Sequence, residues 1–395
     1  MRTFKGISSG NFKPVIGEIT RENKPFYNRS RFIQVTEKLS YRSLGYAGCI
    51  TTGPKGRFFH PDHVYRVKED SIVDKCSLEN GLEKAGPGNG TLEDGDIVCL
   101  RPDGTISVLW ESKSHQNVLF LTEACNCQCI MCPQPPKAHN PVHLKQAEKV
   151  LDLLRGKLVS NICLTGEEPT LLGDKFIYIL ERCTNEHPEA IINILTNGKL
   201  FSDLSFTKKV SQITNNKTLF CISLHSDIDT IHDYLVGKKG SYAQTQTGMY
   251  NLAKCGCLME VRQVVTKTNY KRLKRFSEQM YSYFPFCSHY TFMGLEFHGQ
   301  ARINFEQLSV SPEEFAAPLE EAVLIMHRSG LNVSVYNVPL CLCSEKVRPF
   351  ARQSISNWKN IFSPECADCY ERSNCAGFFS TSEKIPLNLI IPFKE

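Results

Sequence analysis

Three cysteines close together in the sequence are the residues best suited to do chemistry. Cys125, Cys129 and Cys132 follow the spacing C-x3-C-x2-C, and a strand-like run at 117–122 precedes them. Cysteine thiolates ligate iron-sulfur clusters, and a cluster held by three thiolates leaves one iron free to bind a small molecule. Cys127 lies between two of these residues. It is expected to be a loop residue, because a fourth cysteine ligand would occupy the iron that must stay free to bind a small molecule.

A second group of cysteines lies near the carboxyl end of the chain. It consists of Cys341, Cys343, Cys366, Cys369 and Cys375. Four thiolates can enclose an iron-sulfur cluster or a structural zinc ion, so the spacing alone leaves both open. The preferred ligands are Cys341, Cys366, Cys369 and Cys375, with Cys343 in reserve. The other nine of the 18 cysteines are scattered through apolar surroundings and receive no role.

The overall composition is that of an ordinary soluble protein. The chain has 395 residues, 41% hydrophobic and 22% charged, with a net charge of +5, which is enough for two or three domains. No dense Lys/Arg block is present, so nucleic acid is not the expected partner. The amino terminus lacks the apolar core of a signal peptide, and no apolar run approaches the roughly 18 residues of a membrane helix. We therefore expect no membrane association and a cytoplasmic location, where clustered cysteines favour metal ligation over disulfides.

The elements that must position the cysteines change in type along the chain. Strands are predicted at 96–100 and 105–110, after a glycine-rich loop at 81–95, so residues 1–116 are expected to form a β-rich domain. Further strands are predicted at 117–122, 161–165, 191–196, 219–225, 259–266, 289–297 and 332–338. Helix-length segments separate them, and the clearest helix begins with Ser311 as its N-cap and Pro312 as its first residue.

Such alternation builds a parallel sheet or barrel, in which ligands collect at the carboxyl ends of the strands. The first cysteine group follows the first strand of the series. A Thr-Gly-Glu-Glu-Pro stretch at 165–169 follows the second strand, and a Thr-Asn-Gly stretch at 196–198 follows the third. We expect these three loops to converge on one rim. Residues 117–338 are predicted to form this α/β domain, and residues 339–395 a cysteine-rich extension.

Residues 117–338 resemble the radical S-adenosylmethionine (SAM) superfamily, on the strength of the C-x3-C-x2-C loop and the Gly-Glu-Glu-Pro loop at the next strand end. The resemblance implies an α/β fold: a partial (β/α)6 radical SAM barrel with an N-terminal β-rich domain and a C-terminal cysteine-rich extension. It also implies that Cys125, Cys129 and Cys132 hold a four-iron four-sulfur (4Fe-4S) cluster whose open iron binds SAM. Reductive cleavage of SAM would then give a 5′-deoxyadenosyl radical that abstracts hydrogen from the substrate. No residue is assigned as catalytic.

The same resemblance assigns a set of SAM-binding residues near the strand ends: Gly166, Glu168, Pro169, Asn197, Ser223, His225 and Arg262. Glu167 stands where the superfamily has a second glycine, and it would add strain if its backbone angles required glycine. Arg262 lies within a predicted strand. A lone cation there needs an anionic partner, and the SAM carboxylate would serve.

A narrower resemblance is to the HxsC-type maturases of the His-Xaa-Ser system, over about residues 90 to 380. It rests on the stretch at 114–122, the Cys-Pro-Gln-Pro-Pro run at 132–136, and the Pro-Phe-Ala-Arg-Gln-Ser tail at 349–354 with C-x2-C-x5-C. It implies a ribosomally made peptide or small protein substrate rich in His-Xaa-Ser repeats, a second radical SAM maturase and an external electron donor. Related peptide-modifying enzymes carry extra clusters in such extensions, which favours an auxiliary iron-sulfur cluster over zinc. The departures are Glu167 and Ala376, where glycine is expected.

Two other functions remain open from the sequence. In the first, the chain uses the same chemistry on RNA or a small metabolite. A non-catalytic zinc or electron-transfer protein would also hold metal at both cysteine groups, but it leaves the loop at Glu168 and Pro169 unexplained.

Overall fold

The computed structural model describes residues 3–5, 7–8, 14–22, 24–25, 31–36, 48–51, 64–66, 83–84, 92–103, 105–353, 360–379 and 390–394. Most of the predicted glycine-rich loop at 81–95, and Ser354 of the HxsC-like tail, lie outside these residues. The chain divides into two compact units. The first comprises Met1–Ser77, Gly86–Phe120 and Pro141–Cys163, and the second comprises Leu78–Ala85, Leu121–Asn140 and Leu164–Glu395. The expected domain boundaries near 116 and 338 stay predictions.

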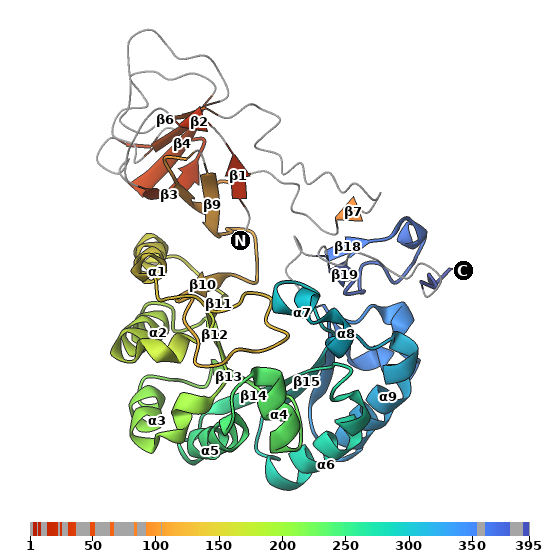
Figure 1. Ribbon diagram of the computed structural model, residues 1–395. Helices are drawn as coiled ribbons and strands as arrows, with labels where there is room; N and C mark the ends of the chain where they lie inside the picture. Colours follow the sequence, from red (N-terminus) through yellow and green to blue (C-terminus); the bar gives the residue numbers. More distant parts are fainter. Residues whose placement is uncertain are drawn as a thin grey trace. The chain divides into compact units, whose positions relative to one another are not determined.

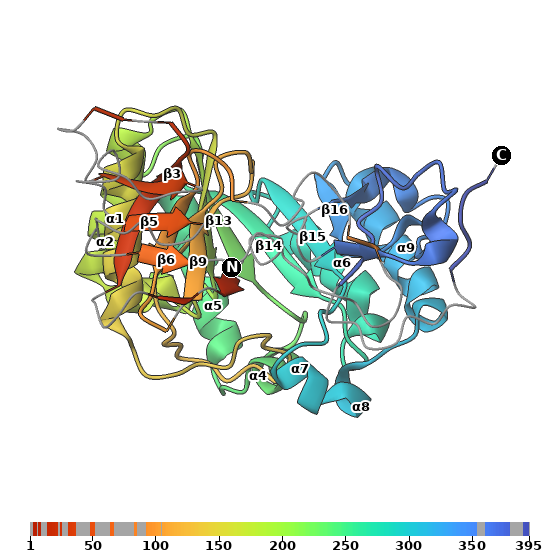
Figure 2. The same cartoon turned by 90° about the horizontal axis from the view of Figure 1, so that it is seen from above.

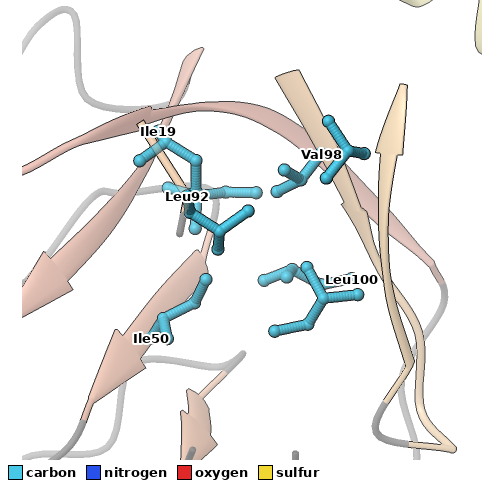
Figure 3. Packing of buried hydrophobic residues seen from close by; sticks show 8 residues of the cluster. Ile19, Ile50, Leu92, Val98 and Leu100 are labelled. Atoms are coloured by element: carbon cyan, nitrogen blue, oxygen red, sulfur yellow. The ribbon is translucent and has the colours of Figure 1, made fainter. Parts of the chain in front are cut away.

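The first unit is built on an eight-stranded sheet with the order β1-β9-β8-β3-β4-β5-β6-β2 (Figure 1). The strands are β1 (Thr3–Lys5), β2 (Ile7–Ser8), β3 (Val15–Thr20), β4 (Phe32–Thr36), β5 (Gly48–Thr51), β6 (Val64–Arg66), β8 (Ile97–Leu100) and β9 (Thr105–Trp110). The predicted strands at 96–100 and 105–110 are β8 and β9. The core of this unit includes Ile19, Ile50, Leu92, Val98 and Leu100 (Figure 3). The β-rich character expected for the N-terminal part is therefore confirmed.

Two further elements belong to the first unit, namely β10 (Val118–Phe120) and α1 (Pro141–Leu154). Within α1, Leu144, Ala147, Val150, Leu151 and Leu154 are buried at helical spacing. Gln146 of α1 lies 3.8 Å from the Cys99 sulfur of β8. The helix thus packs on the N-terminal sheet through its apolar face.

The second unit contains a sheet with the strand order β11-β12-β13-β14-β15-β16-β17, in which neighbours from β12 onward pair in parallel. The strands are β11 (Asn161–Thr165), β12 (Ile191–Thr196), β13 (Thr218–Ser223), β14 (Leu258–Val264), β15 (His289–Met293), β16 (Val333–Tyr336) and β17 (Ala351–Arg352). The helices α2 (Asp174–Glu186), α3 (Leu204–Ser211), α5 (Ser241–Lys254), α6 (Leu273–Tyr283) and α9 (Pro312–Arg328) lie along the outer side of this curved sheet (Figure 1). The predicted α/β fold with a partial barrel is confirmed.

Burial alternates along β12, as it does along a strand whose two faces have different surroundings. In β12, Ile192, Ile194 and Thr196 are buried, whereas Asn193 and Leu195 are half-buried. Successive side chains of a strand point to opposite faces, so one face packs under the helices and the other faces the barrel interior. This interior face carries the polar side chains of the candidate site.

Shorter elements complete the second unit. They are α4 (Asp229–Val236), α7 (Gln300–Ile303), α8 (Phe305–Leu308), β7 (Glu83–Lys84), β18 (Asn360–Phe362) and β19 (Phe378–Phe379), the last three forming a small sheet. Helices α4, α7 and α8 share one apolar cluster through Leu235, Ala301 and Leu308 and lie on the same side of the molecule (Figure 2). No helix in the described part of the chain is both long and apolar enough to span a membrane.

The ends of several elements differ in how well the sequence predicts them. Helix α9 begins as predicted, because the Ser311 hydroxyl accepts from the Glu314 N–H and Pro312 is the first helical residue. The strand expected at 259–266 ends at Val264, since the Thr266 N–H donates to the Asn269 side chain (2.8 Å) instead of pairing in the sheet. The strands expected at 219–225, 289–297 and 332–338 also end early, at Ser223, Met293 and Tyr336.

Candidate functional site

The first cysteine group lies in an irregular loop, residues 121–140, which we call the cysteine loop. The Leu121 N–H donates to the Thr165 carbonyl (2.8 Å), so the loop begins beside the carboxyl end of β11. Cys125, Cys129 and Cys132 are partly exposed and unpaired, whereas Cys127 is buried. The three predicted ligand residues therefore stand near a strand end and are each only partly buried.

The cysteine loop is fastened to α4 and α7 through its backbone. The N–H groups of Gln128 and Ile130 donate to the last carbonyls of α4, those of Val236 (2.9 Å) and Leu235 (3.0 Å). The Ile130 carbonyl accepts from the Asn304 side chain (2.9 Å). A helix end leaves carbonyls without partners in the helix, and here the loop satisfies two of them. Sequence reasoning missed this support, although a glycine directly after a helix-length segment is a usual sign of a helix end.

Gly237, which directly follows α4, lies in close contact with the cysteine loop, so a substitution there tests whether the loop must keep this position. Its φ is +63°, and a Cβ there would lie 2.2 Å from the Gln128 carbonyl oxygen. Gly256 has a similar φ of +71° but open space around it. We expect Gly237→Ala to lower the free energy of unfolding by about 2 kcal/mol more than Gly256→Ala does, because only the former displaces the loop. Urea denaturation of both variants measures the difference. Equal losses would show that the loop tolerates the shift.

The side chain of Cys127 is surrounded by polar groups that do not belong to the predicted ligand set. Its sulfur lies 3.6 Å from the buried Lys199 ammonium nitrogen and 3.9 Å from the Ser241 hydroxyl. The hydrogen bond from the Cys125 thiol, and then the charge of Lys199, lower the pKa of Cys127 to about 7. That Cys127 is a loop residue rather than a ligand stays a prediction.

The three other thiols of the loop are held in their neutral form by their surroundings. The hydrogen bond with Cys127 raises the pKa of Cys125, and burial raises the pKa of Cys129 and that of Cys132, the last to about 12. A bound metal reverses this preference, because its charge stabilises the thiolates. In the portion of the chain that is described, no three or more Cys, His, Asp or Glu side chains stand ready to hold a metal ion. The ligand set Cys125, Cys129 and Cys132 stays a prediction.

The second predicted loop, 165–169, is joined directly to the cysteine loop. The Glu167 N–H donates to the Thr122 carbonyl and the Glu168 N–H to the Ala124 carbonyl, both at 3.0 Å. Gly166 has a φ of +150°, and a Cβ there would lie 2.5 Å from the Thr122 carbonyl oxygen. Position 166 therefore requires glycine, and the expected convergence of these two loops is observed.

Glu167 does not have the strained backbone that its place in the motif suggested. Among the described residues other than glycine, only Asn337 has a positive φ. The condition under which Glu167 would add strain is therefore not met, because its φ is not positive. Its carboxylate lies 3.4 Å from the Cys132 sulfur, and burial raises its pKa.

Glu168 is fully buried, and both of its carboxylate oxygens are occupied by protein donors. Oε1 accepts from the Thr170 N–H (3.2 Å), the Thr170 hydroxyl (2.5 Å) and the Thr196 hydroxyl (2.8 Å), and Oε2 accepts from the Asn197 N–H (2.7 Å). Burial raises its pKa, and these hydrogen bonds oppose that rise. Glu168 thus ties the loop after β11 to the loop after β12, and Pro169 begins the single turn that it caps.

Asn197 is the predicted residue that the structure places nearest the cysteine loop. Its side-chain nitrogen Nδ2 donates to the side-chain oxygen Oδ1 of Asn126 (2.7 Å) and lies 4.0 Å from the Cys125 sulfur. Lys199, which the sequence did not single out, reaches the Asn126 backbone carbonyl at 3.4 Å. The loop after β12 therefore meets the cysteine loop at Asn126 and Cys125, while the loop at 165–169 meets it at Thr122 and Ala124.

The remaining SAM-binding candidates lie on the next two strands. Ser223 ends β13 and stands opposite Arg262 of β14. His225 is buried, and its ring stacks on that of His232 with 5.8 Å between ring centres. The His225 backbone N–H donates to Nδ1 of His232 (3.1 Å), and Nδ1 of His225 accepts from the Val264 N–H (3.4 Å). Their assignment to SAM stays a prediction.

The stacked histidines predict a loss of stability in acid. Burial lowers the pKa of His225 to about 3 and that of His232 to about 4, while unfolded histidine titrates near 6.5. Between these values the unfolded state binds protons that the folded state does not, so the free energy of unfolding falls as the pH drops below 6.5. From pH 7.5 to 5.5 we expect a loss of about 1 kcal/mol per histidine in urea denaturation. His225→Asn keeps an acceptor for Val264 and should halve the loss; an unchanged loss would contradict the assignment.

Arg262 is not the lone cation that the sequence suggested. Its guanidinium forms an ion pair with Glu260, two residues earlier on the same face of β14. Glu260 also binds Nδ1 of His289 (2.7 Å), whose Nε2 lies 2.9 Å from the Ser334 hydroxyl. The premise that Arg262 needs the SAM carboxylate as its partner is therefore wrong. The sequence could have predicted this pair, because residues two apart in a strand lie on the same face and Glu260 is two residues before Arg262.

The C-terminal cysteines lie together. Cys341, Cys366, Cys369 and Cys375 line one small cavity and pack with Phe362 and Ile390. The sulfur of Cys375 accepts from the N–H groups of Leu340 (3.3 Å) and Gly377 (3.4 Å). Cys343 is buried and does not line this cavity. The four preferred cysteines thus line one cavity and Cys343 does not, while which of the five are metal ligands stays a prediction.

The departure at Ala376 has a structural explanation. Gly377 has a φ of +65°, and a Cβ there would lie 2.8 Å from the Ile361 carbonyl oxygen. Ala376 is buried and has no positive φ. Glycine is therefore required at position 377 and not at 376.

Comparison with known proteins agrees with this geometry. Residues 119–273 match the radical SAM superfamily. The chain is 29% identical over 156 residues to AlbA, the antilisterial bacteriocin subtilosin biosynthesis protein of Bacillus subtilis, covering 38% of this chain and 33% of AlbA. It is 26% identical over 169 residues to an uncharacterized protein of Methanocaldococcus jannaschii, covering 42% and 58% of the two chains. This chain therefore spans from a third to less than two thirds of the length of these relatives.

Two solved structures share part of the fold. One is Streptococcus suis SuiB bound to SAM, with 15% identity, a TM-score of 0.46, and 55% and 49% of the two chains covered. The other is anSMEcpe bound to SAM and the Cp18Cys peptide, with 20% identity, a TM-score of 0.42, and 55% and 62% covered. The expected resemblance to the radical SAM superfamily is supported by the family match, and that superfamily uses a 4Fe-4S cluster and SAM. The HxsC-type assignment stays a prediction.

Proposed function

We propose that this chain, which carries a radical SAM domain at residues 119–273, is a cytoplasmic enzyme that modifies a ribosomally made peptide or small protein. The observation that carries the proposal is the direct joining of the cysteine loop to the loop at 165–169. Two backbone hydrogen bonds, to Thr122 and Ala124, and the glycine-only contact at Gly166 hold them together. A protein that merely stored metal would not need this second loop.

The residues present fit a 4Fe-4S cluster and SAM. Cys125, Cys129 and Cys132 would hold the cluster, and the groups after β11 and β12 would line the SAM side of it. When bound, the cluster and SAM supply one-electron chemistry that removes a hydrogen atom from the substrate. The protein's own part is to orient the reactants: Glu168 fixes the two strand-end loops, and Asn197 holds Asn126 beside Cys125.

The peptide class of substrate is supported by two observations. AlbA, to which this chain is 29% identical over 156 residues, is named for the biosynthesis of a bacteriocin. The HxsC-like stretches point to a substrate with His-Xaa-Ser repeats, a second radical SAM maturase as partner and an external electron donor. A peptide with such repeats is therefore the substrate to test first.

The test is anaerobic reconstitution of the full chain with iron and sulfide, followed by SAM and a strong reductant. We expect 5′-deoxyadenosine, and a mass change on a His-Xaa-Ser repeat peptide that needs both SAM and reductant. Absence of 5′-deoxyadenosine with a fully assembled cluster would contradict the radical SAM assignment. Formation of 5′-deoxyadenosine with RNA or a metabolite modified instead would contradict the peptide substrate.

We also propose that Cys341, Cys366, Cys369 and Cys375 hold an auxiliary iron-sulfur cluster. The proposal is supported by the one small cavity that all four side chains line, although among the described residues they are not arranged as a finished metal site. The Cys369→Ala variant should lose iron relative to the unaltered chain when both are purified anaerobically. An unchanged iron content with loss of zinc would assign the site to structural zinc.

A further inference from the structure

A second hollow lies in the carboxyl-terminal part of the second unit, beside the cavity of the C-terminal cysteines, with which it shares Leu340, Glu371 and Phe393. Its volume is about 490 Å³, within the range of pockets that hold small ligands. The side chains that matter are Arg348 of the short helical turn at Arg348–Phe350, Arg352 at the end of β17, and the aromatic pair Tyr370 and Phe393. We call it the arginine pocket.

The two arginines of this pocket have no carboxylate partner in the described part of the chain. The Arg348 guanidinium lies over the Phe393 ring, 4.5 Å from its centre, and its Nε is buried without a hydrogen-bond acceptor among the described residues. Arg352 donates to two neutral groups, the carbonyls of Pro349 and Ala351, both at 2.7 Å. Arg348 is half-buried, and a cation sheltered from water without a counter-charge is costly, so this side chain favours an anion; Arg352 is exposed and adds a second positive charge at the rim.

The carboxylate that does line the pocket is engaged elsewhere. Glu371 accepts from the Asn374 side chain at 3.0 Å and forms no ion pair with Arg348 or Arg352. The pocket therefore keeps two positive charges against one partly occupied negative charge. Guanidinium groups bind carboxylates through paired, charge-assisted hydrogen bonds, which makes a carboxylate the matching group.

The remaining walls suit the rest of a peptide. The rings of Tyr370 and Phe393 lie 5.8 Å apart and present an apolar surface beside the arginines. The Gln353 side-chain N–H groups donate to the carbonyls of Ser373 (2.8 Å) and Cys375 (2.8 Å), which leaves its oxygen as an acceptor for a backbone N–H. A carboxylate next to an apolar side chain on a peptide would match this combination.

The pocket also opens at the functional edge of the sheet. Arg352 is the last residue of β17 and stands opposite Tyr336, the last residue of β16, in parallel register. The carboxyl ends of parallel strands meet at one edge, where ligands collect. Within this unit Arg352 therefore belongs to the same edge as the loops that follow β11 and β12.

We propose that the arginine pocket binds a carboxylate of the peptide substrate, from an Asp or Glu side chain or from the terminal carboxylate, together with a neighbouring apolar residue. The inference rests on the proposed peptide substrate and deepens it, because it names the chemical group by which the peptide is held outside the SAM site.

The test measures binding of fluorescein-labelled peptides to the anaerobically reconstituted full chain by fluorescence anisotropy. Three peptides are compared that differ only at the residue after a Phe and at the carboxyl end. The first has Glu after the Phe and an amidated end, the second has Gln there and an amidated end, and the third has Gln there and a free carboxyl end. We expect the peptide without a carboxylate to bind about tenfold more weakly than the better of the other two, which identifies the source of the carboxylate. Equal binding of all three to the unaltered chain would overturn the proposal.

Substitutions at the two arginines test whether the preference for a carboxylate arises in the arginine pocket. Arg348→Gln and Arg352→Gln should each reduce the preference for a carboxylate, whereas Lys346→Gln should keep it. Lys346 carries the same charge in the same segment, but it pairs with Glu320 and does not line the pocket. A preference that survives in both arginine variants would also overturn the proposal. The assay needs no turnover, so carboxylate-dependent binding without SAM cleavage would refute the proposed function and leave the pocket assignment standing.

Discussion

Replacing Cys129 with alanine is expected to lower 5′-deoxyadenosine formation by more than about a hundredfold, the upper end of what loss of a supporting partner of a metal site costs. Cys129 is the middle thiol of the C-x3-C-x2-C spacing, and it lies on the apolar cluster that joins the cysteine loop to α4. Two remaining cysteines cannot hold a cluster that needs three. Iron content after anaerobic reconstitution and 5′-deoxyadenosine by chromatography measure the loss.

Cys127→Ala is the matched control, because it removes a thiol from the same loop. Its sulfur contacts Lys199 and Ser241, and the side chain is only 3% exposed. We expect this variant to retain iron and SAM cleavage. If it loses both as completely as Cys129→Ala does, then the choice of three ligands is wrong and Cys127 belongs to the set.

Replacing Glu168 with alanine is expected to lower the free energy of unfolding by about 3 kcal/mol, because it leaves four donors without their acceptor in a buried place. Those donors come from Thr170, Thr196 and Asn197. SAM binding should weaken in the same variant, since the loops after β11 and β12 lose their common anchor. Urea denaturation gives the first quantity, and calorimetric titration of SAM into the reconstituted protein gives the second.

Glu167→Ala serves as the control for stability. Glu167 is adjacent in sequence and carries the same charge, but among the described residues its carboxylate makes one contact of hydrogen-bond length, 3.4 Å from the Cys132 sulfur. Glu167→Ala should lower the free energy of unfolding by less than about 1 kcal/mol, as expected for a half-buried side chain outside a hydrogen-bond network. Equal losses for the two variants would show that the buried network around Glu168 does not anchor the loops.

The strands and loops of the barrel were predictable because they depend on local patterns. The strands at 161–165 and 191–196 have the predicted bounds, since apolar residues alternate there and glycine or proline follows. The later strand ends were predicted too long. The chain leaves β15 at Met293, where a Cβ on Gly294 would lie 2.3 Å from the Asn337 carbonyl oxygen, a contact between segments far apart in sequence. Local preference carries no information about such an approach.

By itself the sequence determined the cysteine spacing, the order of strands and helices, and hence the edge of the sheet at which the three loops meet. Only the tertiary structure decided which partner each polar group takes. It placed Glu260 beside Arg262, four donors around Glu168, Lys199 against Cys127, and two arginines without an ion-pair partner among the described residues around one pocket. The physical reason is that the sequence sets which chemical groups the chain carries and on which strand, helix or loop each one lies. Burial and pairing, which set their charge and orientation, arise from contacts between segments that only folding brings together.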